Sequence, residues 1–532
     1  MSDEPRDGDT PAAAPETRAA EREGEVRRAG AGVALITGAK LYFILAGFAV
    51  QFLLPRLLAS AEEYGTYATV LNVVSILNNV LIAGTIQTVS KLVSEREHAA
   101  AAILRRALLF QLVVALCLSG LLAASSTWVA RDILLDARLG PMLAIVSIVV
   151  FAYALYAALI GALNGRRLFA RQAGFDVGFS TMRTAGILVP AALGIGALGS
   201  VAGFSAAAMA ILLAALAIVG VGRSGEGAPT LRSYAKLALP LIVYQSLVNV
   251  MLQIDLSVLR RYATLAALDA GESTTAAAEL GARLAGFYRA AQSFAFIPYQ
   301  LIIPVTFVVF PLVSKAVASD DRESAKTYVR DAMRFSLLVL IGLAAPLVGG
   351  PEGAMRFAFP AEYGAAASAL RILTCAQVFF ALFVIAATIL SGSGRVLASA
   401  LIALAGVLVL LPASALLIAR AGAGDGGVPA MEGAALGTGL GTLTAFVAVT
   451  VTLQRKLGAS FSVLSVVRTL VAGAASIATT ALLLRPTSKV MSLAAMVAGG
   501  VVYLVVLLVT RELTRADLDR FVRRRRKPAS PA

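Results

Sequence analysis

Long apolar segments recur along this chain of 532 residues and restrict its fold more than any other feature. Each has about 20 residues, enough to cross a hydrocarbon core of roughly 30 Å as a helix. Charged residues make up only 14% of the chain, whereas soluble proteins have about 25%. The sequence therefore predicts an all-α polytopic membrane protein with fourteen transmembrane helices. The predicted segments are residues 33–55, 64–87, 103–124, 140–162, 173–197, 200–221, 236–259, 284–312, 333–350, 367–391, 396–419, 431–454, 463–484 and 488–510.

Lys and Arg residues are concentrated in alternate connections between these segments. Connections after the even-numbered segments, together with both tails, hold most of the 46 basic residues, for example Arg166, Arg167 and Arg171. Connections rich in Lys and Arg stay on the cytoplasmic side of a membrane. We therefore predict that both termini are cytoplasmic and that odd-numbered connections, such as residues 260–283, lie outside.

The two tails are rich in charged residues. Residues 1–31 contain much Ala, Glu, Arg and Pro and no apolar stretch, which is typical of a disordered cytoplasmic tail and not of a signal peptide. Residues 511–532 include the basic run 523–527, which we expect to contact anionic lipid. No aromatic residue interrupts this run, and membrane-edge residues account for the net charge of +15. We therefore predict that the protein does not bind nucleic acid.

The two halves of the sequence resemble each other. Three short motifs occur twice, in the same order and at a nearly constant spacing: Gly65-Thr66-Tyr67 with Gly286-Phe287-Tyr288, Val89-Ser90-Lys91 with Val313-Ser314-Lys315, and Gly165-Arg166 with Gly394-Arg395. The repeating unit contains six predicted helices. Because six is an even number, both copies have the same orientation in the membrane and are related by an axis along the membrane normal.

This repeat divides the chain into two lobes of six helices. The first lobe spans residues 32–222, the second spans 232–455, and residues 462–510 add two C-terminal helices. Two lobes around a central cavity can rock and expose a site to each side of the membrane in turn. The architecture therefore predicts transport by alternating access.

The sequence lacks the motifs of an enzyme or of an ATP-driven pump. It has no Gly-x-x-x-x-Gly-Lys-Ser/Thr phosphate loop and no cluster of His, Cys and carboxylates at metal-ligand spacing. Its two cysteines, Cys117 and Cys375, lie in separate apolar segments. We therefore expect a transporter with no cofactor and no bound metal.

Several ionisable side chains fall inside the predicted helices, where a charge is costly unless it is paired or faces water. Lys40, Arg183 and Arg289 could together bind an anionic group such as a diphosphate. The alternative is structural pairing, of Arg183 with Asp176 and of Arg289 with Asp255. Asp255 is also the best candidate for coupling transport to an ion.

Amide side chains form a stripe on the seventh segment. Gln245, Asn249 and Gln253 are spaced by four residues and therefore share one helix face. Gln292 shares a face with Arg289 at a spacing of three. Such amides either join helices or line a wet cavity that passes sugar hydroxyls, and the sequence leaves both interpretations open. We include Gln245, Asn249 and Gln292 among the candidate substrate-binding residues.

Several stretches resemble the polysaccharide flippases of the multidrug/oligosaccharidyl-lipid/polysaccharide exporter superfamily. Residues 62–95 resemble the end of that family's first helix hairpin. Residues 287–323, with Phe-Pro before a Ser at the helix exit, resemble the matching part of its second lobe. Residues 359–382 and 391–395 resemble later helices, and residues 432–435 resemble the start of its twelfth helix.

This resemblance implies two lobes, a V-shaped cavity and no use of ATP. It implies that an undecaprenyl-diphosphate-linked oligosaccharide moves from the cytoplasmic to the outer leaflet of the bacterial inner membrane, for cell-surface polysaccharide synthesis. Lys40 and Arg289 loosely match the first and eighth helices, where the lipid II flippases of the superfamily carry cationic cavity residues. This chain lacks their fuller arginine set on helices 1 and 2, which argues against lipid II as the substrate.

Three other functions stay open on the sequence. A cation-coupled multidrug exporter of the same fold would exchange ions at Asp255. A lipid II flippase would bind its substrate in the same cavity. A membrane scaffold for glycosyltransferases would act through its tails instead, and glycosyltransferases or a polymerase are also the protein partners that we expect of a flippase.

Overall fold

The protein is described here by a computed structural model, which places residues 15–225, 230–303, 321–422, 425–458, 462–483 and 488–513. These residues form fourteen helices of 21 residues or more, in agreement with the fourteen predicted segments. In chain order they are α1 (Pro15–Leu57), α2 (Ala61–Glu95), α3 (Ala100–Trp128), α4 (Leu139–Gly165), α5 (Phe169–Ala192), α6 (Gly196–Val219), α7 (Leu231–Asp269), α8 (Thr274–Ala295), α10 (Arg322–Gly349), α12 (Ala367–Gly392), α13 (Val396–Ala421), α14 (Val428–Leu457), α15 (Val463–Leu483) and α16 (Lys489–Val509).

Eleven helices in the described part of the chain are long and apolar enough to cross a membrane by composition alone. The three long helices that do not meet this standard are α2, α5 and α8. These three carry much of the polar sequence singled out above, including Arg183 on α5 and Arg289 on α8. The protein is therefore a polytopic all-α membrane protein in which the least apolar helices hold candidate site residues.

Several helices differ from their predicted extents; α10, for example, begins at Arg322 instead of residue 333. Helix α1 begins at Pro15, so residues 15–31, which we expected to be disordered, are helical, and residues 1–14 lie outside the described part. Helix α7 continues to Asp269 and α8 starts at Thr274, so most of the predicted connection 260–283 is helical. Residues 304–320, with the second copy of the Val-Ser-Lys motif, and the basic run 523–527 also lie outside the described residues.

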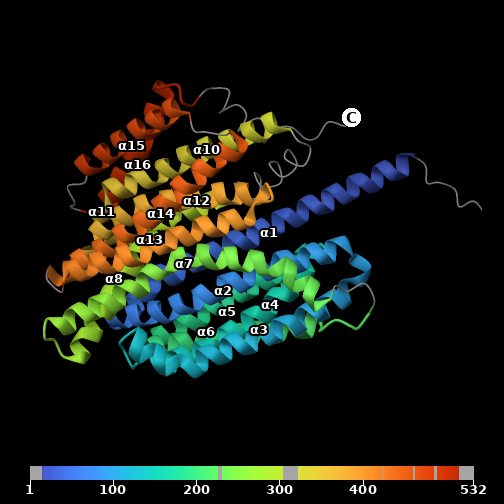
Figure 1. Ribbon diagram of the computed structural model, residues 1–532, viewed down its shortest axis with the longest axis horizontal. Coiled ribbons are helices and arrows are strands. Elements are labelled where there is room, and N and C mark those ends of the chain that lie inside the picture. Colours follow the sequence, from blue (N-terminus) through green and yellow to red (C-terminus); the bar gives the residue numbers. More distant parts are fainter. Residues whose placement is uncertain are drawn as a thin grey trace, which may run out of the picture.

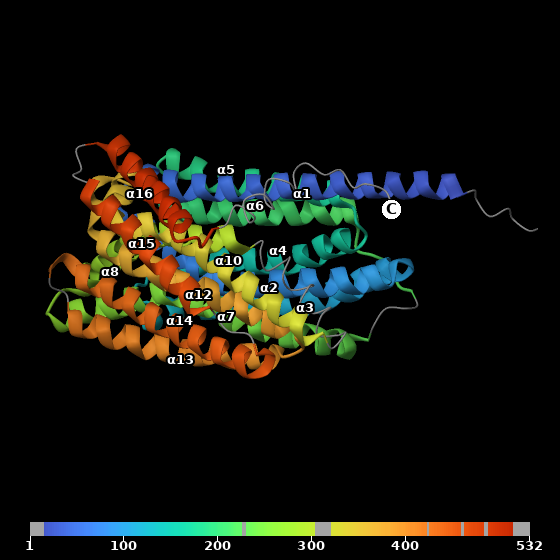
Figure 2. The same cartoon turned by 90° about the horizontal axis from the view of Figure 1, so that it is seen from above.

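The helices form two packed lobes (Figure 1). Helices α1–α6 pack with one another as the first lobe, and α7, α8, α10 and α12–α14 form the second, joined to the first mainly where α2 packs on α7 and α8. Seen from above, α1 runs along α5 and α6 on one side and α13 lies on the opposite side (Figure 2). Helices α15 and α16 pack on α10 at the margin of the second lobe.

The most buried helices occupy matching places in the two lobes. In α4, 78% of the most apolar stretch is buried, and in the span that contains α12 the share is 72%, more than in any other span found in the described residues. They correspond to the fourth and tenth predicted segments, which the six-helix repeat makes equivalent. Both lobes are therefore organised around the same helix of the repeat.

The two lobes approach most closely where α2 crosses α8. A Cβ atom added to Gly65 would lie 1.7 Å from the carbonyl oxygen of Ala282, and one added to Gly286 would lie 2.2 Å from that of Ala61. Small residues allow such close backbone contact between membrane helices, where burial of apolar surface gives little driving force. Gly65 and Gly286 are also the first residues of the repeated motif, so equivalent positions of the two lobes meet here.

A carboxylate just after α16 connects the C-terminal helix pair to α10. Glu512 is buried and accepts hydrogen bonds from Arg334 Nε on α10, at 2.7 Å, and from the Ser465 hydroxyl on α15. Arg468 Nη1 lies 3.5 Å from its second carboxylate oxygen. Burial alone would raise the pKa of Glu512, but the hydrogen bonds from Ser465 and Arg334 and the charge of Arg334 lower it.

The Gly286→Ala substitution should destabilise the protein by about 1–3 kcal/mol, because the new methyl group overlaps the α2 backbone. Gly120→Ala on α3 is the control, since its Cβ would meet nothing within 4 Å. A helical Gly→Ala change by itself favours the helix by about 1 kcal/mol, so Gly120→Ala should be neutral or stabilising. Thermal unfolding of the detergent-purified variants measures both, and equal melting temperatures would contradict the tight crossing.

Candidate functional site

Lys40 on α1 forms an ion pair with Asp176 on α5. Their Nζ and Oδ2 atoms are 2.9 Å apart, and 54% of the lysine side chain is exposed against 10% of the aspartate. The sequence offered Arg183 as the partner of Asp176. Seven residues along one helix correspond to about 10 Å of rise, whereas the neighbouring helix α1 brings Lys40 directly to the carboxylate.

Arg183 is held by aromatic rings. Its guanidinium lies 4.7 Å from the centre of the Phe43 ring on α1, and within hydrogen-bonding reach of the Tyr153 hydroxyl on α4. Among the described residues it has no carboxylate within ion-pairing distance, and its Nε atom makes no hydrogen bond to them. A cation–π contact offsets part of the cost of burying this charge but leaves it un-neutralised.

Arg289 and Asp255 do not contact each other directly, because Gln292 stands between them. Arg289 Nη1 donates to Gln292 Oε1 at 3.3 Å, and Gln292 Nε2 donates to Asp255 Oδ1 at 3.0 Å. The predicted shared face of Arg289 and Gln292 is thus present. The Asp255 carboxylate, only 1% exposed, also accepts from the hydroxyls of Tyr288 at 2.9 Å and Thr438 at 3.2 Å.

The amide stripe on α7 joins the two lobes. Asn249 Nδ2 donates to the backbone carbonyls of Ser75 and Ile76 on α2, at 2.7 and 3.0 Å. One turn further along α7, Gln253 accepts two hydrogen bonds from Asn72 Nδ2. These contacts favour helix joining as the role of the stripe at these positions, while Gln245 is half-buried one turn before Asn249.

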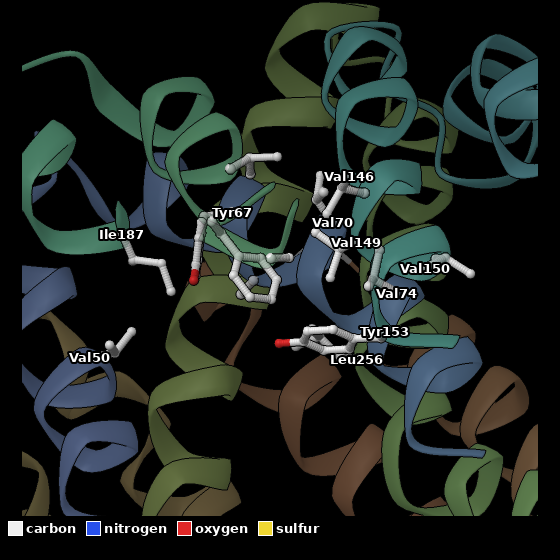
Figure 3. Packing of buried hydrophobic residues seen from close by; sticks show 14 of the residues in the cluster. Val50, Tyr67, Val70, Val74, Val146, Val149, Val150, Tyr153, Ile187 and Leu256 are labelled. Carbon is white, nitrogen blue, oxygen red and sulfur yellow. The ribbon is translucent and has the colours of Figure 1, made fainter. Parts of the chain in front are cut away.

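A tyrosine that we did not select from the sequence lies near both arginines. Tyr67 on α2 (Figure 3) is within range of the charges of both Arg183 and Arg289, although those two residues belong to different lobes. The repeated motif could have pointed to Tyr67, because Tyr67 is the last residue of its first copy. Tyr288, which bonds to Asp255, is the last residue of the second copy. Equivalent tyrosines therefore stand beside the charged groups of the two lobes.

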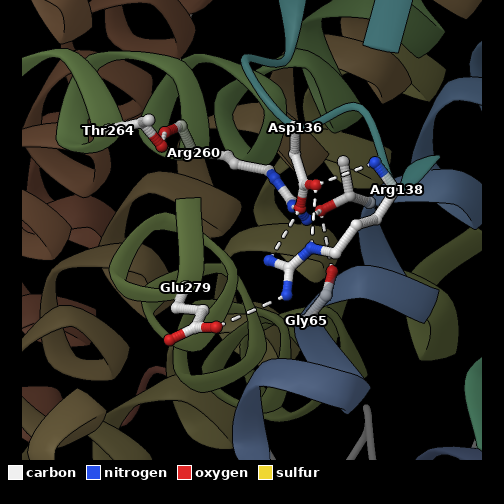
Figure 4. A network of polar contacts seen from close by, with 7 residues as sticks. Gly65, Asp136, Arg138, Arg260, Thr264 and Glu279 are labelled. Atoms are coloured by element: carbon white, nitrogen blue, oxygen red, sulfur yellow. Dashed lines mark hydrogen bonds and ion pairs between the residues drawn. The ribbon is translucent and has the colours of Figure 1, made fainter. Parts of the chain in front are cut away.

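A second polar cluster, which we call the Arg260 network, joins the lobes near the odd-numbered connections (Figure 4). Arg260 on α7 is fully buried, and its Nη2 atom lies 2.6 Å from Asp136 Oδ2, between α3 and α4. Arg260 Nη1 donates to Thr69 on α2 at 2.9 Å. Arg138 binds Asp136 at 2.9 Å and lies 3.7 Å from Glu279 on α8. We did not predict this network from the sequence, because Arg260 falls in the predicted connection 260–283.

Two further arginines cross between the lobes at the same end. Arg261 Nη1 donates to the carbonyls of Asp132 and Ile133, just after α3, at 2.5 and 2.7 Å. Arg56 at the end of α1 donates to the carbonyl of Ala358 at 2.6 Å, at the end of α11 (Pro351–Ala358). These contacts and the Arg260 network hold the lobes together at the end that carries the odd-numbered connections.

The Arg260 network stays charged over the ordinary range of pH. Burial alone would raise the pKa of Asp136, but its hydrogen bonds from Arg138 and the charges of Arg260 and Arg138 lower that pKa below its ordinary value of 3.8. The hydrogen bond to Asp136 correspondingly raises the pKa of Arg138. Since the folded-state pKa of Asp136 is depressed, its stabilising charge is fully present above about pH 4 and is lost as the pH falls through the lower value.

The Asp136→Asn substitution should destabilise the protein by about 3–5 kcal/mol at neutral pH, because it leaves the buried Arg260 charge uncompensated. Asp132→Asn, at an exposed position nearby, is the control. The difference in melting temperature between wild type and Asp136→Asn should be constant from pH 5 to 8 and narrow below about pH 4, as Asp136 itself becomes neutral. A difference that vanished already at pH 6 would contradict the depressed pKa.

The fold and these groups define a multi-pass membrane protein of two lobes with cations inside the helix bundle. Residues 29–317 match the model of the polysaccharide biosynthesis protein family. The chain belongs to this family. It is accordingly a multi-pass membrane protein of the polysaccharide biosynthesis family.

Solved structures share the fold at low sequence identity. The lipid II flippase MurJ in an inward closed conformation superposes with a TM-score of 0.72 at 15% identity, over 91% of this chain and 100% of that one. A multidrug resistance MATE family transporter in an inward-facing conformation gives a TM-score of 0.57 at 13% identity, over 81% of this chain and 99% of that one. A eukaryotic MATE transporter gives 0.55 at 15% identity, over 80% and 93% of the two chains. No curated protein sequence matches this chain significantly.

Proposed function

We propose that this protein is a flippase that moves an undecaprenyl-diphosphate-linked oligosaccharide from the cytoplasmic to the outer leaflet of the bacterial inner membrane, for cell-surface polysaccharide synthesis. The observation that carries the proposal is the pair Arg183 and Arg289. Each lies inside the helix bundle without a carboxylate partner among the described residues, and both lie close to Tyr67. Unneutralised cations at such a place call for an anionic ligand or water.

In this proposal the two guanidinium groups bind the diphosphate from opposite lobes. Guanidinium groups hold phosphate oxygens by paired hydrogen bonds, and such contacts are strong where water is excluded. Lys40 is the third cation, since more than half of its side chain is exposed and Asp176 occupies only one side of the ammonium group. Gln245 would contact the first sugars, while Asn249 keeps α7 against α2. The predicted sugar contact of Gln292 is not supported, because Gln292 is fully buried and its amide is engaged by Arg289 and Asp255.

Alternating access would then require the lobes to separate at the end held by the Arg260 network. We assign this end to the outer face of the membrane, because the odd-numbered connections carry few basic residues, and both termini to the cytoplasm. The described state is closed there by Arg56, Arg260 and Arg261. Rocking of the lobes would break these contacts and release the headgroup outward.

Replacement of Lys40 and Arg289 together by Ala should slow flipping by about a hundredfold, because each lost contact to a charged phosphate is worth about 1.5 kcal/mol or more. Cells that depend on this variant should lose surface polysaccharide and accumulate the undecaprenyl-diphosphate oligosaccharide on the cytoplasmic leaflet. Mass spectrometry of the extracted lipids, with quantification of the membrane-inserted protein, measures this outcome.

The matched control replaces Lys91 and Arg106, two exposed cations, by Ala. Normal export by the Lys40/Arg289 double variant at wild-type abundance would contradict the proposed cationic substrate site.

Depletion of the whole protein distinguishes the alternative functions. No trapped lipid, with altered sensitivity to cationic drugs, would identify a multidrug exporter, and trapped lipid II would identify a lipid II flippase. Loss of export on removal of residues 514–532 alone would favour a scaffold for glycosyltransferases.

We further propose that Asp255 couples transport to an ion. Its buried carboxylate is surrounded by the neutral donors Tyr288, Gln292 and Thr438, and the Gln292 amide connects it to Arg289. A carboxylate without a cationic partner can gain or lose a proton or a sodium ion at moderate cost, unlike one in an ion pair. Binding of that ion would change the orientation of Gln292 and hence of the Arg289 guanidinium.

The Asp255→Asn variant should lose most of its response to an imposed proton or sodium gradient while still binding substrate. Asp269→Asn, at an exposed position on the same helix, should respond like wild type. The measurement is the rate of substrate flipping in proteoliposomes with and without each gradient. An undiminished response in Asp255→Asn would exclude this residue as the coupling site.

A further inference from the structure

We infer that the hydroxyl groups of Tyr67 and Tyr153 are further ligand-positioning groups, which donate hydrogen bonds to the diphosphate held by Arg183 and Arg289. The inference rests on the proposed function and adds two residues that the sequence did not indicate. It follows from where the two hydroxyls lie, from which partners they have, and from the chemistry of the groups around them.

Both tyrosines face the same region between the helices. In Figure 3 the Tyr153 hydroxyl points towards the side where Val50 of α1 and Ile187 of α5 lie, and the Tyr67 hydroxyl lies on that side as well. Arg183 is one helical turn before Ile187 on α5 and therefore faces the same way. The charges of Arg183 and Arg289 both reach Tyr67, and Arg183 also reaches Tyr153.

In the part of the chain that the structure describes, neither hydroxyl donates a hydrogen bond. Within the described residues Tyr67 donates no hydrogen bond to another side chain or carbonyl, although the residue is only 6% exposed. Tyr153, 8% exposed, lies near the Arg183 guanidinium, which carries donors only and therefore cannot accept the hydroxyl proton. Tyr288 and Tyr503 do find acceptors, in Asp255 and the Leu338 carbonyl, whereas the buried hydroxyls of Tyr156, Tyr234 and Tyr363 have no partner among the described residues.

The groups around this region are therefore almost all donors. The Arg183 charge reaches both tyrosines and the Arg289 charge reaches Tyr67, while the carboxylates of Asp176 and Asp255 are engaged by Lys40 and Tyr288. A site made of donors is complementary to a ligand that is rich in acceptors and negatively charged. A diphosphate matches both requirements, whereas a cationic drug matches neither. The hydroxyls would orient the phosphate oxygens that the flexible arginines attract.

Detergent-purified wild type, Tyr67→Phe and Tyr153→Phe provide the test, by calorimetric titration with undecaprenyl diphosphate, inorganic pyrophosphate and undecaprenol. Each Phe variant should bind undecaprenyl diphosphate about tenfold more weakly, the effect of one hydrogen bond to a charged group. Pyrophosphate should compete with the lipid, and the same substitutions should weaken its binding. Binding of the uncharged undecaprenol should not change.

Two controls separate the possible failures. Tyr503→Phe, whose hydroxyl bonds to Leu338 at the α10–α16 contact, should bind like wild type. If Arg289→Ala weakens diphosphate binding but both Phe variants bind normally, the tyrosine inference is wrong and the proposed function stands. If wild type and Arg289→Ala bind diphosphate equally poorly, the proposed function fails. A loss of melting temperature in the Phe variants with unchanged affinity would mean a structural role only, and would overturn the inference.

Discussion

The close crossing of α2 and α8 is the contact on which the relation between the two lobes depends. At Gly65 and Gly286 the helix backbones meet with no space for a side chain, so the lobes can pack this closely only through these two glycines. Tyr67 follows Gly65 by two residues, and Arg289 follows Gly286 by three. The crossing therefore places a tyrosine of one lobe beside an arginine of the other. The amides of Asn72 and Asn249 bond α2 to α7 and maintain the same arrangement.

The protein accommodates charge inside the helix bundle in three different ways. The Arg260–Asp136 pair is neutralised directly and is fully enclosed, which suits a contact that must hold until the lobes separate. Asp255 is surrounded by neutral donors. Arg183 rests on an aromatic ring. Only the last two arrangements leave a charge available to a ligand or an ion, and this difference separates groups that hold the structure from groups that could act on a substrate.

The repeat shows how two similar lobes acquire different chemistry. Tyr67 and Tyr288 occupy equivalent positions, yet Tyr288 donates to a carboxylate of its own lobe while Tyr67 stands near two arginines from different lobes. The first lobe thus contributes Lys40 and Arg183 to the proposed substrate site, and the second contributes Arg289 together with the proposed ion site at Asp255. A single amide, Gln292, connects the two sites, which gives ion binding a short route to the substrate.

The number of helices, their approximate ends and the six-helix repeat could be predicted from the sequence, because a membrane helix must satisfy its backbone hydrogen bonds within one apolar stretch of defined length. The Arg289–Gln292 contact was also predictable, since it depends on spacing within one helix. The pairing of side chains that lie on different helices was not predictable from the sequence. Lys40 rather than Arg183 pairs with Asp176, and Arg260 is buried because α7 continues past its apolar segment. Such choices depend on which helix faces meet in the folded bundle, and the spacing of residues along the chain carries no information about that.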